Sequence, residues 1–327
     1  MRLAIKIILL AAAVLGGSAI YVDRRAASRE AATMAAFPPE GQFLTVNGRQ
    51  VHAVVKGSGP DLVLIHGAGG STRDFTFDLV DRLTDRYRVI VFDRPGLGYT
   101  DRTDDKYDRA ITSQAESPAE QADLLHAAAL QLGATNPIVL GHSYGASVAM
   151  AWALEYPDTT AGIVDVAGVT MPWTSGLDAL YTVNGSAFGG AILPVLISAF
   201  VSDAQLRTTF EGVFAPNPAP QGYTDYVGEG LSIRASSLRA SAKQVNTLLP
   251  FITEMATRYA TIDMPVEILH GDADRSVPID IHSIPLSHLI PGANLTILPG
   301  VGHMPHHIDP DAVIAAIDRV ATRAGLR

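Results

Sequence analysis

A glycine-flanked serine is the first group in the sequence whose setting indicates chemistry. Residues 141–145 read Gly-His-Ser-Tyr-Gly, a G-x-S-x-G pattern between an expected strand at 137–140 and an expected helix at 146–156. A sharp turn from strand to helix exposes the serine hydroxyl and points helix amides at developing negative charge. The sequence therefore predicts that Ser143 is a nucleophile, and a glycine-flanked turn without activity is the alternative.

A serine hydroxyl needs a base and an orienting carboxylate to react at neutral pH. Asp274 stands in the loop after an expected strand at 266–269, and His303 follows the last expected strand at 295–298. The chain order Ser, Asp, His is one of the known orders of such triads. Asp272 competes for the role of the acid, but we expect it to bond within its own loop, as aspartates in turns do.

Several other histidines adjoin these motifs. His66 and His142 each stand beside a motif glycine and are expected to be packed, hydrogen-bonded spacers. His306 and His307 lie close to His303 and mimic a metal cluster, but no HExxH-type pair or strong carboxylate set accompanies them in the sequence. The chain contains no cysteine, which excludes disulfides, thiolate metal sites and a cysteine nucleophile. The sequence thus predicts no metal and no cofactor.

The elements that must position these residues alternate between strand and helix. Asn47-Gly48 is a hairpin signal, and Ser117 and Glu120 form a capping box that begins a helix. Strands are expected at 43–46, 51–55, 62–65, 87–92, 137–140, 163–166, 266–269 and 295–298, and helices at 75–83, 117–132, 146–156 and 311–323. This alternation predicts an α/β fold with a mostly parallel sheet and helices on both faces, built from core segments 41–170 and 261–327.

One interval interrupts the alternation. Between Val166 and Val266 about 100 residues contain no clear core strand, which is too many for a simple crossover connection. We predict an inserted helical cap over residues 171–260 that acts as an apolar lid, because long insertions in compact domains are often functional. The alternative is a group of helices that packs on its own small core.

Together these motifs resemble the α/β-hydrolase family over residues 43–324. The resemblance implies an eight-stranded, mostly parallel sheet flanked by helices, with an inserted cap and, in this chain, an N-terminal hydrophobic helix. It also implies that residues 66–70, His-Gly-Ala-Gly-Gly, are the oxyanion loop, with the amides of Ala68 and Tyr144 as donors. Residues 93–98 resemble the loop after the fourth strand, and residues 270–274 resemble the acid loop.

Two departures limit the resemblance. Residues 66–70 match neither the H-G-G-G nor the H-G-x-P form of the oxyanion loop, so which loop amide completes the hole stays open. The nucleophile position holds Ser143, whereas the haloalkane dehalogenases and epoxide hydrolases of the family carry aspartate there. Those two chemistries are therefore set aside.

The N-terminal segment is a targeting segment. Residues 3–22 are almost wholly apolar and supply 20 positions, the length that spans a hydrocarbon core, with Lys6 reaching the interface. We expect residues 1–23 to anchor the protein in a membrane, with an exported, periplasmic or extracellular, catalytic domain. Secretion after cleavage of a signal peptide is the alternative. Residues 24–40, rich in Ala, Arg and Glu, are expected to form a linker.

Net charge limits the partners. The 327 residues include 24 Lys and Arg against 33 Asp and Glu, a net charge of −9, which argues against nucleic acid and polyanionic substrates. The sequence predicts a serine hydrolase that cleaves a carboxylic ester or similar small acyl substrate with an apolar acyl group. The alternatives are another acyl or carbon–carbon hydrolase, a cofactor-free perhydrolase of the haloperoxidase type, and a non-catalytic protein that binds a ligand in this fold. The oligomeric state stays open.

Overall fold

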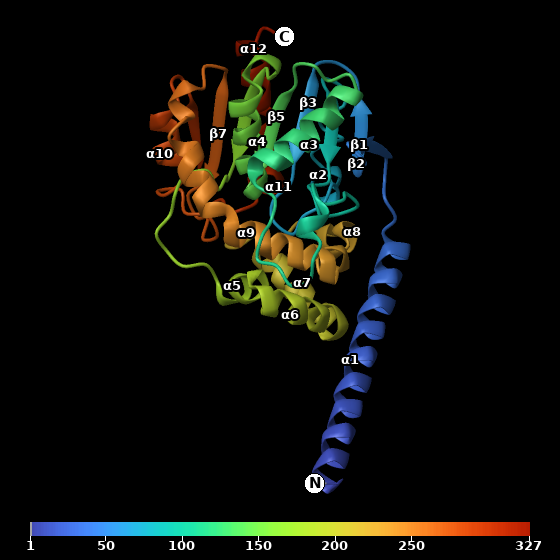
Figure 1. Ribbon diagram of the computed structural model, residues 1–327. Helices are drawn as coiled ribbons and strands as arrows, with labels where there is room; N and C mark the ends of the chain where they lie inside the picture. Colours follow the sequence, from blue (N-terminus) through green and yellow to red (C-terminus); the bar gives the residue numbers. More distant parts are fainter. Residues whose placement is uncertain (1) are drawn as a thin grey trace.

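Buried strands alternating with helices build one eight-stranded sheet in the computed structural model, which describes residues 2–327 and is drawn in Figure 1. Met1, part of the predicted segment 1–23, lies outside the described residues. The strands are β1 Gln42–Val46, β2 Arg49–Gly57, β3 Asp61–Ile65, β4 Arg88–Phe92, β5 Ile138–His142, β6 Gly162–Val166, β7 Val266–Gly271 and β8 Asn294–Leu298. The α-helices are α1 Arg2–Ala36, α2 Arg73–Thr76, α3 Pro118–Gln131, α4 Tyr144–Glu155, α5 Ala179–Gly185, α6 Ala187–Phe200, α7 Asp203–Gly212, α8 Tyr223–Val227, α9 Ala235–Ala256, α10 Ser283–Leu289, α11 Pro305–Ile308 and α12 Pro310–Arg323.

The sheet is mostly parallel, as the sequence predicts. The strands follow the order β1-β2-β4-β3-β5-β6-β7-β8. β1 pairs antiparallel with β2, and β2 antiparallel with β4, while the other pairs are parallel. The β1–β2 hairpin turns at Asn47 and Gly48 with φ of 50° and 78°, and a two-residue turn of this type requires positive φ at both positions. Because the strands from β3 onward run in the same direction, their carboxyl ends share one edge of the sheet.

Helices cover both faces of the sheet. One core cluster combines α3, α4 and α9 with one face, and the other combines α12 and the segment after β3 with the opposite face. β5 and β6 are buried along their whole length, which fits the apolar residues 138–140 and 163–164 at their centres, although β6 also buries Asp165. The predicted capping box is confirmed at the start of α3, where Ser117 Oγ accepts the Glu120 N–H at 3.1 Å and Glu120 accepts the Ser117 N–H at 2.8 Å.

The helix predicted at 75–83 is wrong in extent. α2 ends at Thr76, and turns follow. In a continuing helix the Thr76 carbonyl would accept the N–H of Val80. Instead the Tyr226 hydroxyl donates to the Thr76 carbonyl at 3.2 Å, and the Val80 N–H donates to Phe75 O at 3.1 Å. The apolar residues of this segment are spaced so that they pack against the sheet, although the segment is not a continuous helix. The hydrogen bond from Tyr226 accompanies the end of the helix at Thr76.

The first helix is longer than the sequence predicts. α1 continues without a break through residues 24–36, where a linker is expected. Ala, Arg and Glu are good helix formers, and the end of α6 supplies partners for this stretch. Arg25 Nε donates to Ala199 O at 2.8 Å, and Arg29 donates to Val201 O at 2.7 Å. These carbonyls belong to the end of α6, where a helix leaves acceptors without intrahelical partners.

The insertion between β6 and β7 is helical and contains α5 to α9. In Figure 1 these helices lie below the sheet, beside the upper half of α1, while the C-terminus lies at the opposite end of the body. α9, at 22 residues, is the longest of them and packs against α4, α5 and α6. It therefore connects the outer cap helices to the core helix that begins beside Ser143.

Candidate active site

The turn that carries Ser143 joins β5 to α4. Ser143 has φ 53° and ψ −119°, a conformation that residues other than glycine rarely adopt. A Cβ on Gly145 would overlap the Ile65 carbonyl of β3, and one on Gly141 would overlap the Gly145 carbonyl. Both glycines of the motif are therefore needed so that the strand and the helix can approach closely around the serine.

Three residues far apart in the chain meet at this turn. His303 Nε2 lies 3.0 Å from Ser143 Oγ, and His303 Nδ1 lies 2.7 Å from Asp274 Oδ2. The carboxylate only accepts hydrogen bonds, so Nδ1 carries the proton and Nε2 presents its lone pair to the serine hydroxyl. The structure thus brings together the three side chains that the sequence predicts as nucleophile, base and acid.

Asp274 is held as an ionised acceptor. Its Oδ1 accepts the N–H groups of Ser276 at 2.8 Å and Val277 at 3.0 Å, and its side chain is fully buried. Burial of this carboxyl opposes ionisation, but hydrogen bonds from His270 and His303 outweigh it and hold the pKa of Asp274 well below its usual range. A carboxylate fixed in this way orients the His303 ring.

The competing acid and the two flanking histidines have other partners. The expectation that Asp272 bonds within its own loop is wrong: Asp272 is exposed and accepts the N–H of Gly300 at 2.6 Å, so it braces the neighbouring loop before His303. His142 Nε2 donates to the backbone carbonyl of His303 at 2.9 Å, and burial holds the pKa of His142 well below its usual range. His66 Nε2 accepts a backbone N–H at 3.0 Å, and burial lowers the pKa of His66 to about 4. The prediction that both histidines are packed, hydrogen-bonded spacers is confirmed.

The predicted oxyanion loop lies beside the serine. A Cβ on Gly67 would stand 3.1 Å from the Ser143 Cβ, so this loop touches the nucleophile turn. Within residues 2–327 the N–H groups of Ala68 and Tyr144 donate to no other group. Two free amides beside a serine hydroxyl form the kind of donor pair that stabilises an oxyanion.

Arg94 is not predicted from the sequence as a site residue, although it belongs to the recognised loop 93–98. It is fully buried, and burial lowers its pKa to about 10, so it stays protonated at neutral pH. It donates to Gly67 O at 3.1 Å and to Gln244 of α9 at 2.6 Å, and its guanidinium lies 3.9 Å from the ring centre of Tyr144. One cation therefore ties the oxyanion loop, the residue after the nucleophile and the cap together.

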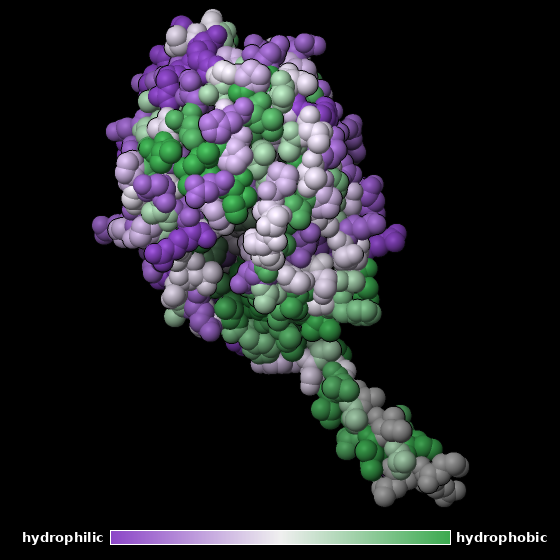
Figure 2. All heavy atoms as spheres, turned by 90° about the vertical axis from the view of Figure 1, so that its left-hand side faces the viewer, coloured by the Kyte–Doolittle hydropathy of each residue, from purple (hydrophilic) through white to green (hydrophobic). Residues whose placement is uncertain are grey.

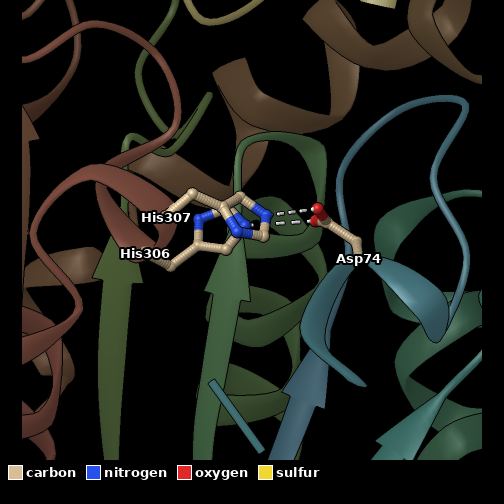
Figure 3. Close-up of side chains that lie close together, drawn as sticks. All are labelled: Asp74, His306 and His307. Carbon is tan, nitrogen blue, oxygen red and sulfur yellow. Dashed lines mark hydrogen bonds and ion pairs between the residues drawn. The ribbon is translucent and has the colours of Figure 1, made fainter. Parts of the chain in front are cut away.

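A second buried group involves the two histidines that resemble a metal cluster. Figure 3 shows His306 and His307 of α11 pointing at Asp74 of α2. His306 Nε2 lies 3.2 Å from Asp74 Oδ2, and His307 Nε2 lies 2.8 Å from Asp74 Oδ1. The Tyr223 hydroxyl of α8 donates to Asp74 Oδ1 at 2.8 Å. The carboxylate that the sequence does not place near these histidines is therefore supplied by α2.

The chemistry of this group fits a hydrogen-bonded tie better than a metal site. Burial lowers the pKa of His306 to about 4, and the two histidines hold the pKa of Asp74 well below its usual range, so a carboxylate meets a neutral His306 imidazole, and both rings turn Nε2 toward it. A metal on Nε2 would move each proton to Nδ1. Both Nδ1 atoms are buried and lack an acceptor in the described part of the chain, whereas metal-bound histidines almost always donate through their second nitrogen.

The comparison with known proteins follows from this geometry. The model of the alpha/beta hydrolase family matches residues 62–316. The chain belongs to the alpha/beta hydrolase family. The 2-(acetamidomethylene)succinate hydrolase of Mesorhizobium japonicum is 25% identical over 287 residues, which cover 84% of this chain and 90% of that protein.

Two further comparisons extend over most of this alpha/beta hydrolase. The 2-hydroxymuconate semialdehyde hydrolase of Pseudomonas putida is 27% identical over 291 residues, covering 81% of this chain and 88% of that protein. The crystal structure of a membrane phospholipase A superimposes with a TM-score of 0.65 over 98% of each chain at 20% identity. The last similarity shows the fold, including the long apolar N-terminal helix.

Proposed function

We propose that the protein is a serine hydrolase that cleaves a carboxylic ester or a similar acyl substrate through Ser143, His303 and Asp274. The observation that carries the proposal is the pair of contacts on one imidazole ring, 3.0 Å to the Ser143 hydroxyl and 2.7 Å to the Asp274 carboxylate. This is the arrangement in which a histidine takes the proton of a serine as the serine attacks.

The reaction proceeds in two halves. Ser143 Oγ bonds to the acyl carbon while its proton passes to His303 Nε2, and the bond from that carbon to the leaving oxygen then breaks as His303 returns the proton to this oxygen. Water attacks the acyl-enzyme next and gives a proton to His303. That proton then returns to Ser143 as the carboxylic acid leaves. Asp274 stays ionised throughout and stabilises the imidazolium.

The amides of Ala68 and Tyr144 hold the oxyanion in this account. Their free N–H groups and the contact between the Gly67 backbone and Ser143 support that assignment. Backbone donors fixed before the reaction lower the barrier without reorganising, and one such donor contributes about 10²–10³ in rate. No cofactor or metal takes part in this scheme.

Two relatives carry the names of hydrolases that act on substrates other than simple esters, 2-(acetamidomethylene)succinate and 2-hydroxymuconate semialdehyde. An amide or carbon–carbon bond is therefore the second candidate target. The same triad serves these reactions, since substrates of this family differ chiefly in the pocket that receives them.

The N-terminal helix α1 is assigned to membrane anchoring, with the catalytic domain exported. The most apolar 18-residue stretch of α1 has a mean hydropathy of 2.1, and none of it is buried against the body. The helical insertion α5 to α9 serves as the lid, since α9 reaches the site through the hydrogen bond between Gln244 and Arg94. The alternative is a cleaved signal peptide. In that case the mature chain would lack the apolar first half of α1.

The test is substrate turnover by the full-length protein in detergent. p-Nitrophenyl esters of increasing acyl length, aminoacyl arylamides and diketones are compared, and we expect ester cleavage to dominate. Ser143→Ala should lower kcat roughly 10⁴-fold or more. The matched control is Ser147→Ala, because Ser147 lies one turn along α4 and donates to Val169 O at 2.6 Å, away from His303. Ester turnover that survives in Ser143→Ala would overturn the proposal.

A further inference from the structure

The cap contains a long segment without charge. The sequence carries no Asp, Glu, Lys, Arg or His from residue 179 to residue 202, and this segment folds into α5 and α6. The two helices meet at a bend of 111°. With 7 and 14 residues, each helix is about 10 or 20 Å long, too short to cross a hydrocarbon core of about 30 Å. The segment therefore lies on a surface and does not span a membrane.

The polarity of α6 is opposite to that of an ordinary surface helix. Phe188, Ile192, Leu196 and Phe200, spaced four residues apart, form one stripe with exposed fractions of 74%, 61%, 38% and 49%. The residues of α6 that are buried against the body are the small or polar Gly190, Pro194, Ser198 and Ala199. A helix that faced water would bury its large apolar side chains instead.

Leu180 and Val183 of α5 extend this stripe, with exposed fractions of 53% and 46%. We call these two residues and the four of the α6 stripe the cap face. Figure 2 shows it as an apolar band at the lower end of the body, beside the point where α1 emerges. Contiguous exposed apolar surface of this kind marks a contact with a partner or a membrane.

The position of α1 indicates which apolar medium covers the cap face. The ring centres of Tyr21 and Phe200 lie 6.5 Å apart, and the Arg25 guanidinium lies 5.4 Å from the Phe200 ring centre. Tyr and Arg at the end of an apolar helix mark the depth of the lipid headgroups. Phe200 shares that depth, so α6 ends at the level where α1 leaves the bilayer.

We infer that the cap face lies in the headgroup region of the same bilayer that holds α1, with its apolar side chains at the boundary of the acyl chains. This inference rests on the proposed anchoring by α1. The charge-free segment, the exposed apolar stripe and the neighbouring arginines are the features of an interfacial helix. In this orientation the cap of the hydrolase contacts the membrane, and the active site has access to acyl esters dissolved in the bilayer. The proposed substrate class is then amphiphilic or lipid esters.

The absence of cysteine from the sequence makes single-cysteine labelling the appropriate test. The full-length protein, with an environment-sensitive fluorophore at Phe188→Cys or Ile192→Cys, is reconstituted in vesicles of phosphatidylcholine and phosphatidylglycerol. Some vesicles carry spin-labelled lipids whose quencher lies near the top of the acyl chain. Leu15→Cys in α1 reports on the anchor. Leu130→Cys is the matched control, since Leu130 is 43% exposed at the end of α3, where the chain turns back to the start of β5.

We expect blue-shifted emission and quenching by spin-labelled lipid at positions 188, 192 and 15, and neither change at position 130. Quenching at 15 with water-like emission at 188 and 192 would overturn the inference and leave the anchor intact. Blue-shifted emission at 188 and 192 without lipid quenching would also overturn it, because a second copy of the chain would then cover the cap face. Absence of quenching at 15 would instead refute the anchoring on which the inference rests.

Discussion

At the scale of single residues, Arg94 lies beside the proposed catalytic residues without a hydrogen bond to Ser143, Asp274 or His303 in the described part of the chain. Its guanidinium holds the Gly67 carbonyl and packs on the Tyr144 ring, and these two residues flank the Ala68 and Tyr144 amides assigned to the oxyanion. The planar guanidinium has several donors and binds the Gly67 carbonyl oxygen and the Gln244 side-chain oxygen at the same time. The ammonium of a lysine, on a flexible chain, does not do this. We therefore propose Arg94 as a positioning residue for the proposed oxyanion hole.

Replacing Arg94 with Lys keeps the charge and removes the planar guanidinium. Because the oxyanion amides act in the transition state, we expect kcat to fall about tenfold while KM changes little. Steady-state kinetics on an aryl ester, with the unfolding midpoint measured in parallel, checks this. A rise in KM at unchanged kcat would show that Arg94 serves substrate binding instead.

How far single residues are predictable depends on the kind of evidence they leave in the sequence. Ser143, Asp274 and His303 stand in the turn or loops that follow predictable strands, so parallel strand order brings those segments to one edge of the sheet. The part played by Arg94 depends on contacts with Gly67 and Gln244, which are remote in the chain, and no local pattern records them. The signal that the sequence does offer is a charged residue two positions after a buried strand.

At the scale of elements, the Asp74 group joins three short helices. It connects α2 after β3, α8 of the insertion and α11, which begins two residues after His303. Contacts with α8 also explain why the helix predicted at 75–83 is wrong in extent. Tyr223 and Tyr226 of α8 bind the α2 segment at Asp74 and Thr76. A contact between segments 150 residues apart is invisible to local periodicity, whereas the hairpin turn and the capping box are local and were predictable.

Replacing Asp74 with Asn removes the negative charge and one of the two buried oxygens that accept from His306, His307 and Tyr223. We expect the free energy of unfolding to fall by about 2–4 kcal/mol, measured by urea denaturation of the detergent-solubilised protein. Asp78→Asn is the matched control, since Asp78 pairs with Arg82 at 2.7 Å on a partly exposed surface, where such a pair contributes at most about 1 kcal/mol. Equal losses in the two variants would contradict the buried tie.

Addition of Zn²⁺ tests whether the Asp74 group is a set of hydrogen bonds or a metal site. Because the Asp74 group is satisfied by its own donors, we expect neither Zn²⁺ nor a chelator to change the unfolding midpoint of the wild-type protein. Stabilisation by Zn²⁺ that disappears in Asp74→Asn would instead establish a metal centre at this position.

At the scale of the whole molecule, the two ends of the body face different surroundings. α1 and the cap face lie at one end, and the C-terminus lies at the other (Figure 1). The active-site loops follow the carboxyl ends of the strands, on the side of the helical insertion. The polarity of the parallel sheet therefore directs the site toward the cap, and the sequence contains this orientation implicitly in its strand order. The sequence of α6 is apolar almost throughout, so it does not reveal that the large apolar side chains face outward and the small ones are buried.

Buried histidines make the stability of the whole body depend on pH. Burial lowers the pKa values of His66, His282 and His306 to about 4. The unfolded chain binds these protons near pH 6.5 and the folded chain does not, so the stability is present above pH 6.5 and is lost as the pH falls toward 4. His52, whose pKa is raised by Asp93 despite its burial, contributes in the opposite direction.

We therefore expect the urea midpoint of the full-length protein to fall between pH 7 and pH 5. Each of the three histidines removes roughly 1–2 kcal/mol of unfolding free energy over this interval. Denaturation curves at the two pH values in the same detergent check the direction. A midpoint that stays constant or rises would show that the histidines are protonated in the folded state.

The central claim is that Ser143 is an activated nucleophile. The most direct measurement is the intact mass of the full-length protein after incubation with a fluorophosphonate probe, with His303→Ala and Ser143→Ala alongside. We predict one adduct on the wild-type protein, mapped to Ser143 by peptide mass spectrometry, and no adduct on either variant at the same exposure. A folded wild-type protein that takes no adduct, or one that is labelled equally without His303, would contradict the account.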